Sequence, residues 1–222
     1  MGQCTFGLVL RYLLYALAVL LLAGCGGADD STGVETRATS AGTTTYDVAS
    51  AGFTIAVPES WRTISADEFA QGGKWESVIT ETPALAPYAQ AFQGSDSVLK
   101  FAAVDPRVQD DFATNLNVIV EELSADATLE DYEQAFISQL QSLPNVVGAI
   151  DRQRVELPAG PALRASYKLR LLTAGQTLTV SVLQYALVDE GRAFILTYTT
   201  LPATATAYEG TFTRSAESFR LT

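Results

Sequence analysis

The residue types that most often carry catalysis are scarce in this chain. It contains no histidine, and therefore lacks the usual general base, the Ser-His and Cys-His pairs and the commonest transition-metal ligand. Lysine occurs only at positions 74, 100 and 168. No nucleophile elbow, P-loop or dinucleotide fingerprint is present. We therefore predict no enzyme and no catalytic, cofactor-binding or metal-binding residues; a carboxylate pair or a Ser-Lys arrangement is the catalytic chemistry that stays open.

A second set of residues has a spacing that suits binding. Arg164, Lys168 and Arg170 alternate with apolar residues, and a period of two places the cations on one face of a strand. With Arg152 and Arg154 nearby in sequence, they predict a basic strip for an acidic partner or an anionic ligand. The alternative is a solvent-facing surface whose cations pair with surplus acids. Because buried cations without partners are costly, we expect part of this face to be open.

Acidic residues gather in the middle of the chain, and two interpretations of them are open. One is loose binding of a hard cation such as calcium through carboxylate oxygens, and the other is a solvated acidic face. We favour the solvated face, because the spacing does not match an EF-hand loop. The cluster consists of Asp105, Asp110, Asp111, Glu121, Glu122, Asp126, Glu130, Asp131 and Glu133.

The N-terminal segment has the organisation of a targeting signal. Arg11 is the only charged residue before Asp29, and the 12 residues 12–23 are almost wholly apolar. A membrane-spanning helix needs about 20 such residues, so this run fits the apolar region of a secretory signal peptide instead. The tetrapeptide Leu22-Ala23-Gly24-Cys25 follows it directly.

That tetrapeptide resembles the lipobox of bacterial lipoproteins, in which the cysteine receives a thioether-linked lipid. The resemblance implies that residues 1–24 are a signal peptide and that Cys25 carries a diacylglyceryl group and a further acyl chain such as palmitate. Two or more acyl chains anchor a protein stably. The expected location is the extracytoplasmic face of the cell membrane or outer membrane. An ordinary signal peptide with a chance cysteine is the alternative, whereas Phe6 excludes the myristoylation pattern.

Net charge and cysteine content agree with such a lipid tether. The chain has 14 basic and 25 acidic residues, and Arg11 leaves with the signal peptide. Anionic membrane surfaces repel so acidic a domain, and nucleic acid requires basic patches. Cys4 also leaves with the signal peptide, so no cysteine other than Cys25 remains for disulfides or thiol chemistry.

These residues need a stalk and a folded domain to position them. Residues 25–45 are rich in small and polar residues, which predicts a flexible stalk with a reach of roughly 25 Å. Residues 46–222 suffice for one globular domain. Periodicity and turn signals predict helices beginning at Ala66 and over 83–92, 129–143 and 203–219. They predict strands over 46–48, 53–57, 98–104, 116–122, 146–157, 163–172, 177–188 and 193–199.

Short turns between successive strands predict antiparallel pairing, as in the hairpin at Ala51-Gly52. The expected fold class is α+β, with a central antiparallel sheet of six to seven strands and helices packed on both faces. The segment Thr128-Leu-Glu-Asp131 is a start signal for a helix, and apolar residues at three- and four-residue spacing follow it. The helix over 129–143 is therefore the best-marked element.

The segment from Phe53 through Pro58 to Trp61, and the closing Ser218-Phe219 pair, resemble the PsbP-like superfamily, which includes lipoproteins of the LpqN type. The resemblance covers residues 46–222 and implies an α/β/α sandwich. The photosynthetic members act through basic and metal-linked contacts that this acidic, histidine-free chain lacks, so their function is not carried over. We expect Trp61 and Phe219 to fill the core.

Three functions remain open from the sequence. A membrane-anchored, non-catalytic binding or assembly module with an envelope protein partner ranks first. A carrier or sensor of a small or lipidic ligand ranks second, and an unrecognised enzyme ranks third. A deep cavity would favour the carrier, whereas a flat exposed sheet face would favour the module.

Overall fold

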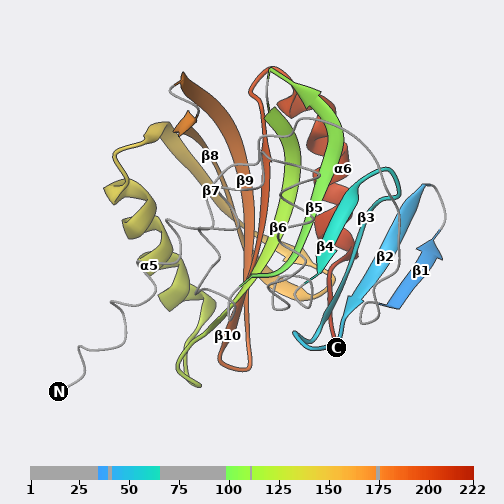
Figure 1. The fold of residues 1–222 in the computed structure, drawn as a ribbon. Coiled ribbons are helices and arrows are strands. Elements are labelled where there is room, and N and C mark those ends of the chain that lie inside the picture. The colour runs from blue at the N-terminus through green and yellow to red at the C-terminus, as the bar shows by residue number, and fades with distance from the viewer. Residues whose placement is uncertain (1–34, 40–41, 66–98, 111, 174–175) are drawn as a thin grey trace, which may run out of the picture.

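The structure is a computed structural model that describes residues 35–39, 42–65, 99–110, 112–173 and 176–222. Within these ranges there are eleven strands, which form two antiparallel sheets, and two helices (Figure 1). The predicted signal peptide over 1–24, Cys25 and the helices predicted from Ala66 and over 83–92 lie outside the described residues.

The larger sheet has seven strands, all paired antiparallel, in the order β4-β5-β6-β10-β9-β8-β7. Their bounds are β4 Arg62–Ser65, β5 Leu99–Gln109, β6 Phe112–Glu122, β7 Val146–Leu157, β8 Gly160–Thr173, β9 Gln176–Asp189 and β10 Arg192–Thr200. The six strands predicted from residue 98 onward are confirmed, although most of them are longer than predicted.

The turn between β9 and β10 shows how local sequence favours a tight hairpin. Asp189 pairs with Arg192, which leaves Glu190 and Gly191 as a two-residue loop. Both loop residues have positive φ, 45° and 72°, as the mirror-image turns of tight hairpins require. A side chain at Gly191 would also meet the Cα of Ala125 at 3.2 Å, so glycine is favoured there on two grounds.

A second, smaller sheet has the strand order β1-β2-β3-β11, which the sequence did not predict. Its strands are β1 Glu35–Thr39, β2 Thr43–Val48, β3 Phe53–Pro58 and β11 Arg220–Leu221. The hairpin predicted at Ala51-Gly52 is confirmed, but it belongs to this sheet and not to the central one. Strand β11, which follows the last helix, pairs with β3.

The smaller sheet also corrects the predicted stalk over residues 25–45. Residues 35–39 and 43–45 are strand, and they pair with one another in the β1–β2 hairpin. Composition had suggested disorder because this segment has little apolar surface to bury. Backbone hydrogen bonding to a neighbouring strand orders it without such burial. The prediction of a flexible stalk is therefore wrong for these two segments.

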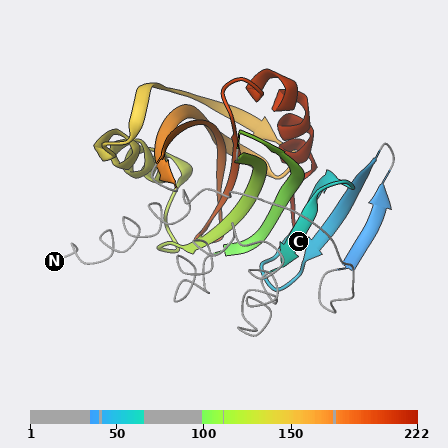
Figure 2. The same ribbon diagram turned by 45° about the horizontal axis from the view of Figure 1, so that its top comes forward.

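Buried side chains form two clusters, and successive residues of a strand alternate between them. In β10, Ala193 and Ile195 belong to the first cluster, whereas Phe194, Leu196 and Tyr198 belong to the second. The sheet therefore buries apolar side chains on each of its faces. Figure 2 shows how strongly this sheet curves, with the smaller sheet beside its β4 end.

The first cluster takes in helix α5, Leu129–Ser142, the best-marked element of the sequence. Its predicted start is confirmed, and a capping box forms there: Thr128 Oγ1 accepts a hydrogen bond from the Asp131 amide, and the Asp131 carboxylate accepts one from the Thr128 amide. Tyr132, Phe136 and Leu140 are buried, as their spacing predicts. The predicted helix over 129–143 is confirmed to within one residue.

The second cluster takes in helix α6, Ala205–Ser218, together with β3 of the smaller sheet. Ser218 Oγ accepts a 2.8 Å hydrogen bond from the Ala56 amide, and the rings of Phe219 and Phe53 lie 5.2 Å apart. Trp61 and Phe219 are buried, which confirms their predicted place in the core. Helices are therefore not the sole cover of the larger sheet, because β3 shares this cluster.

Candidate functional site

Strand β8 has the alternation that the sequence predicted. Leu163, Tyr167 and Leu169 are buried in the first core cluster. Arg164 is partly exposed, and Lys168 and Arg170 are exposed. The three cations thus lie on the other face of the strand, toward α6, and this part of the face is open, as we expected.

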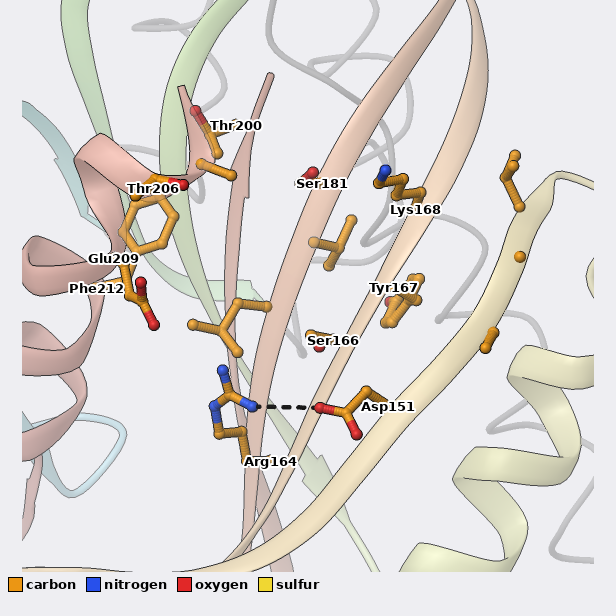
Figure 3. Close-up of a pocket in the computed structure, with 16 residues that line it drawn as sticks. Asp151, Arg164, Ser166, Tyr167, Lys168, Ser181, Thr200, Thr206, Glu209 and Phe212 are labelled. Carbon is orange, nitrogen blue, oxygen red and sulfur yellow. Dashed lines mark ion pairs between the residues drawn. The ribbon is translucent and has the colours of Figure 1, made fainter. Parts of the chain in front are cut away.

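A pocket of about 570 Å³ lies on that face, between α6 and the strands β7, β8 and β9. Figure 3 shows Thr206, Glu209 and Phe212 on the α6 side. The volume falls within the usual range of small-molecule sites, roughly 300–1,000 Å³. The other side and the floor are lined by Val147, Gly148, Ala149 and Asp151 of β7, by Arg164, Ser166, Tyr167 and Lys168 of β8, and by Ser181, Val182 and Leu183 of β9.

The pocket divides the predicted basic strip. Arg164 and Lys168 line the pocket, whereas Arg170 does not. Arg170 lies near the end of β8, where its backbone amide donates a 2.8 Å hydrogen bond to the Asn145 carbonyl. The long, curved strand therefore does not present the three cations to one ligand-sized space.

The two arginines that the sequence placed near the strip, Arg152 and Arg154, pair across β7 and β8 with Ala165 and Leu163 of the first core cluster, and so lie on the other face of the sheet. Arg154 Nε lies 2.9 Å from Glu133 of α5, and it takes no part in the pocket. Its pairing with Leu163 across β7 and β8 places it on the α5 face of the sheet. The pocket therefore holds fewer cations than a strip of five would have supplied.

Within the pocket, Arg164 is paired and Lys168 is not. Arg164 Nη1 lies 3.8 Å from Asp151 Oδ2, and this pair marks one end of the pocket (Figure 3). The Asp151 side chain is 76% exposed, so solvent screens the pair and its contribution to stability is small. Neither the Lys168 nor the Glu209 side chain has an ion pair or hydrogen bond among the described residues.

Sequence reasoning missed the helix side of the pocket. Thr206, Glu209 and Phe212 follow one another at three-residue spacing, which places them on one face of α6. The sequence predicted a helix over 203–219 but gave no functional role to Glu209. The spacing was a usable signal for a common face, but it does not show which part of the sheet that face meets.

Helix α6 is fixed beside the sheet by a buried carboxylate on β5. The Asp105 side chain is 0% exposed and accepts hydrogen bonds from Tyr208 Oη at 2.7 Å and from Arg107 Nη2 at 2.6 Å. Burial by itself would raise the pKa of Asp105, but these hydrogen bonds outweigh it and hold the pKa below its ordinary value. The ionised carboxylate thus joins β5 to the helix that forms one wall of the pocket.

The predicted acidic cluster is dispersed in the structure. Among the described residues, no group of three or more histidine, cysteine, aspartate or glutamate side chains is placed to hold a metal ion. Asp105 is bound by Arg107 and Tyr208, Asp131 caps α5, and Glu133 pairs with Arg154. Neighbours in sequence thus have separate structural partners.

No helix in the described part of the chain is both long enough and apolar enough to cross a membrane. Cys25, to which the sequence assigns the lipid, lies outside the described residues. Lipidation of Cys25 therefore stays a prediction from the sequence.

No model of a known protein family matches this sequence, and no curated protein matches it. Among solved structures, the chain is similar to the cyanobacterial PsbP protein CyanoP of Synechocystis sp. PCC 6803, with 13% identity and a TM-score of 0.48. That match covers 90% of this chain and 98% of CyanoP.

Two further structures show a comparable likeness. LpqN of Mycobacterium tuberculosis, involved in cell envelope biogenesis, is 14% identical with a TM-score of 0.48, covering 85% of this chain and 90% of LpqN. The Ran-binding protein Mog1p of Saccharomyces cerevisiae is 13% identical with a TM-score of 0.46, covering 81% of this chain and 95% of Mog1p. These neighbours include both kinds of protein that the PsbP-like resemblance named. We transfer no function from them.

Proposed function

We propose that this protein is a lipid-anchored, extracytoplasmic binding module without catalytic activity, and that its ligand occupies the pocket between α6 and β7–β9. The observation that carries the proposal is the opening of this pocket onto Arg164 and Lys168, two cations of an otherwise acidic domain. An acidic group of a ligand would be attracted to Lys168, which has no ion pair among the described residues.

The shape of the site favours a small ligand over a broad protein contact. A flat sheet face would suit a protein partner, whereas an open pocket of about 570 Å³ has room for a ligand of small-molecule size. The carrier or sensor that ranked second from the sequence is thus the form of binding module that the geometry favours.

The pocket also offers little support for catalysis. Ser166 and Ser181 line it, but no lysine or carboxylate is hydrogen-bonded to either hydroxyl among the described residues. A serine nucleophile needs such a base within hydrogen-bond reach. With no histidine in the chain, the pocket is better suited to hold a ligand than to transform it.

A photo-reactive leucine at position 183, which lines the pocket, tests binding in the producing bacterium. We expect it to crosslink to a ligand after illumination, and we expect Lys168→Glu to abolish that crosslink. Arg170→Glu is the matched control, because it reverses a charge on the same strand face outside the pocket. The same photo-reactive leucine in place of Val108, which is exposed on β5, controls for chance encounters. A crosslink that is lost equally in both charge-reversal variants would place binding outside the pocket and contradict the proposal.

The lipid anchor has a separate test. Cells fed labelled palmitate should incorporate the label into the wild-type protein and not into Cys25→Ser, because the thioether-linked lipid requires the cysteine sulfur. Labelled Cys25→Ser protein would show that the anchor is not at Cys25.

A further inference from the structure

The charges of the pocket are of both signs, and this bears on what the pocket binds. Lys168 on β8 and Glu209 on α6 line it from different elements, and Figure 3 shows them on opposite sides. Neither side chain has an ion pair or hydrogen bond among the described residues, whereas Arg164 and Asp151 neutralise each other at one end. One free cation and one free anion therefore face the same space.

Apolar side chains lie in the same pocket as these two charges. Leu183 lines it from β9, Phe212 from α6 and Val147 from β7. A ligand that complements this arrangement has an ammonium group at one end, an acidic group at the other and an apolar segment between them. Opposite charges that face each other across a binding site fix the orientation of a ligand more than they raise its affinity.

We propose that the pocket binds a short apolar peptide with both termini free, its α-ammonium group beside Glu209 and its carboxylate beside Lys168. This inference rests on the proposed function, because it names the ligand class of the same pocket. Phosphoethanolamine head groups also carry both charges, but their charges are two carbons apart with no apolar segment between them. The apolar lining therefore favours the peptide.

The hydroxyl groups of the pocket suit the backbone of such a peptide. Ser166 and Ser181 line the strand side, and Thr206 lines the helix side. A hydroxyl group both donates and accepts hydrogen bonds, so these residues can pair with either an amide or a carbonyl of the ligand. Peptides of different apolar sequence would then bind alike.

Calorimetric titration of the full chain, purified from cell membranes in a non-ionic detergent, tests this inference with four probes. The probes are trialanine, N-acetyl-trialanine, trialanine amide and glycerophosphoethanolamine. We expect trialanine to bind about fivefold more tightly than either capped form, since each cap removes one partly exposed charge contact. Glycerophosphoethanolamine should bind more weakly than trialanine.

Two variants connect each terminus to its residue. Glu209→Gln should weaken the binding of trialanine by about fivefold. It should leave the binding of N-acetyl-trialanine unchanged, because the acetyl group has already removed the ammonium charge. Lys168→Gln should weaken trialanine and leave trialanine amide unaffected. Arg170→Gln, outside the pocket, should change none of the affinities.

The outcomes separate this inference from the proposed function. If N-acetyl-trialanine binds as tightly as trialanine and Glu209→Gln has no effect, the proposal of a zwitterionic peptide is wrong. The proposed function, with an anionic ligand in the pocket, is then not contradicted. Tighter binding of glycerophosphoethanolamine than of trialanine, or no binding of any probe, would also contradict the proposal that the ligand is a peptide. The proposed function fails separately, when the photo-reactive leucine at position 183 gives no crosslink that depends on Lys168.

Discussion

Two carboxylates on the larger sheet are both buried, but they differ in their hydrogen-bond partners and in the direction of their pKa shifts. Asp105, on β5, is 0% exposed and accepts hydrogen bonds from Arg107 and Tyr208. Glu121, on β6, is 6% exposed, and its Oε2 has no hydrogen-bond partner. The pKa of Asp105 lies below its ordinary value, whereas burial raises the pKa of Glu121 to about 7.

The difference shows that partners, and not depth, set the charge of a buried acid. Burial disfavours the ionised form of both groups, but charge-assisted hydrogen bonds compensate for it at Asp105 alone. Close to Glu121 lies Tyr132 of α5, a fully buried phenol whose hydroxyl also lacks a hydrogen-bond partner. The contributions of Asp105 and Glu121 to stability therefore change with pH in opposite directions.

The largest expected effect is on the pH dependence of stability at Glu121. Its folded pKa of about 7 lies above the value of 4.5 for the free side chain, so the free energy of unfolding falls as pH rises between those values. The fall amounts to about 3 kcal/mol. Glu121→Gln should remove this slope when urea unfolding is measured at several values from about pH 5 to about pH 8.

Glu122→Gln is the matched control for that measurement, because Glu122 is the exposed neighbour on the same strand. It should keep the wild-type slope. An unchanged slope in Glu121→Gln would mean that Glu121 is ionised throughout, and the contrast with Asp105 would disappear.

The second effect concerns the partnered carboxylate. Asp105→Asn should lower the free energy of unfolding by about 2 kcal/mol near neutral pH, because it weakens charge-assisted hydrogen bonds to Arg107 and Tyr208. Thermal unfolding measures the change, and Asp126→Asn, at an exposed position, should have almost no effect. A loss no larger than that control would show that the hydrogen bonds to Asp105 add nothing to stability.

The stabilising contribution of Asp105 should also be lost in acid. Because the folded pKa of Asp105 is lowered, its contribution is present above the ordinary pKa of 3.8 and is lost as pH falls through the folded value. Wild type should therefore approach Asp105→Asn in stability as the solution is acidified. Parallel curves for the two proteins would contradict a lowered pKa.

The smallest effect concerns the start of α5, which covers part of the face on which Glu121 lies. Thr128→Ala should lower the free energy of unfolding by about 1 kcal/mol, because it removes the hydroxyl that accepts a hydrogen bond from the Asp131 amide. Thr128→Ser keeps that hydroxyl and should retain most of the stability. If serine and alanine were equally destabilising, the threonine methyl group and not the cap would matter.

Local sequence was sufficient for the elements that local interactions define. The helix α5 followed from Thr128, Asp131 and a helical spacing of apolar residues, and the hairpin between β2 and β3 followed from Ala51-Gly52. Sequence could not show that Glu35–Thr39 pairs as a strand, because pairing depends on where a neighbouring backbone lies. It also could not separate Asp105 from Glu121, since both belong to one acidic stretch.

The sequence by itself determined which side of β8 carries charge, because a strand alternates its side chains whatever surrounds it. It is also the sole basis for predicting a signal peptide over 1–24 and a lipid anchor at Cys25. Only the tertiary structure decided that Arg164 and Lys168 meet Glu209 of α6 in one pocket while Arg170 does not. The physical reason is that a pocket forms where distant segments pack, and the Asp105–Tyr208 hydrogen bond that joins β5 to α6 links residues 103 positions apart.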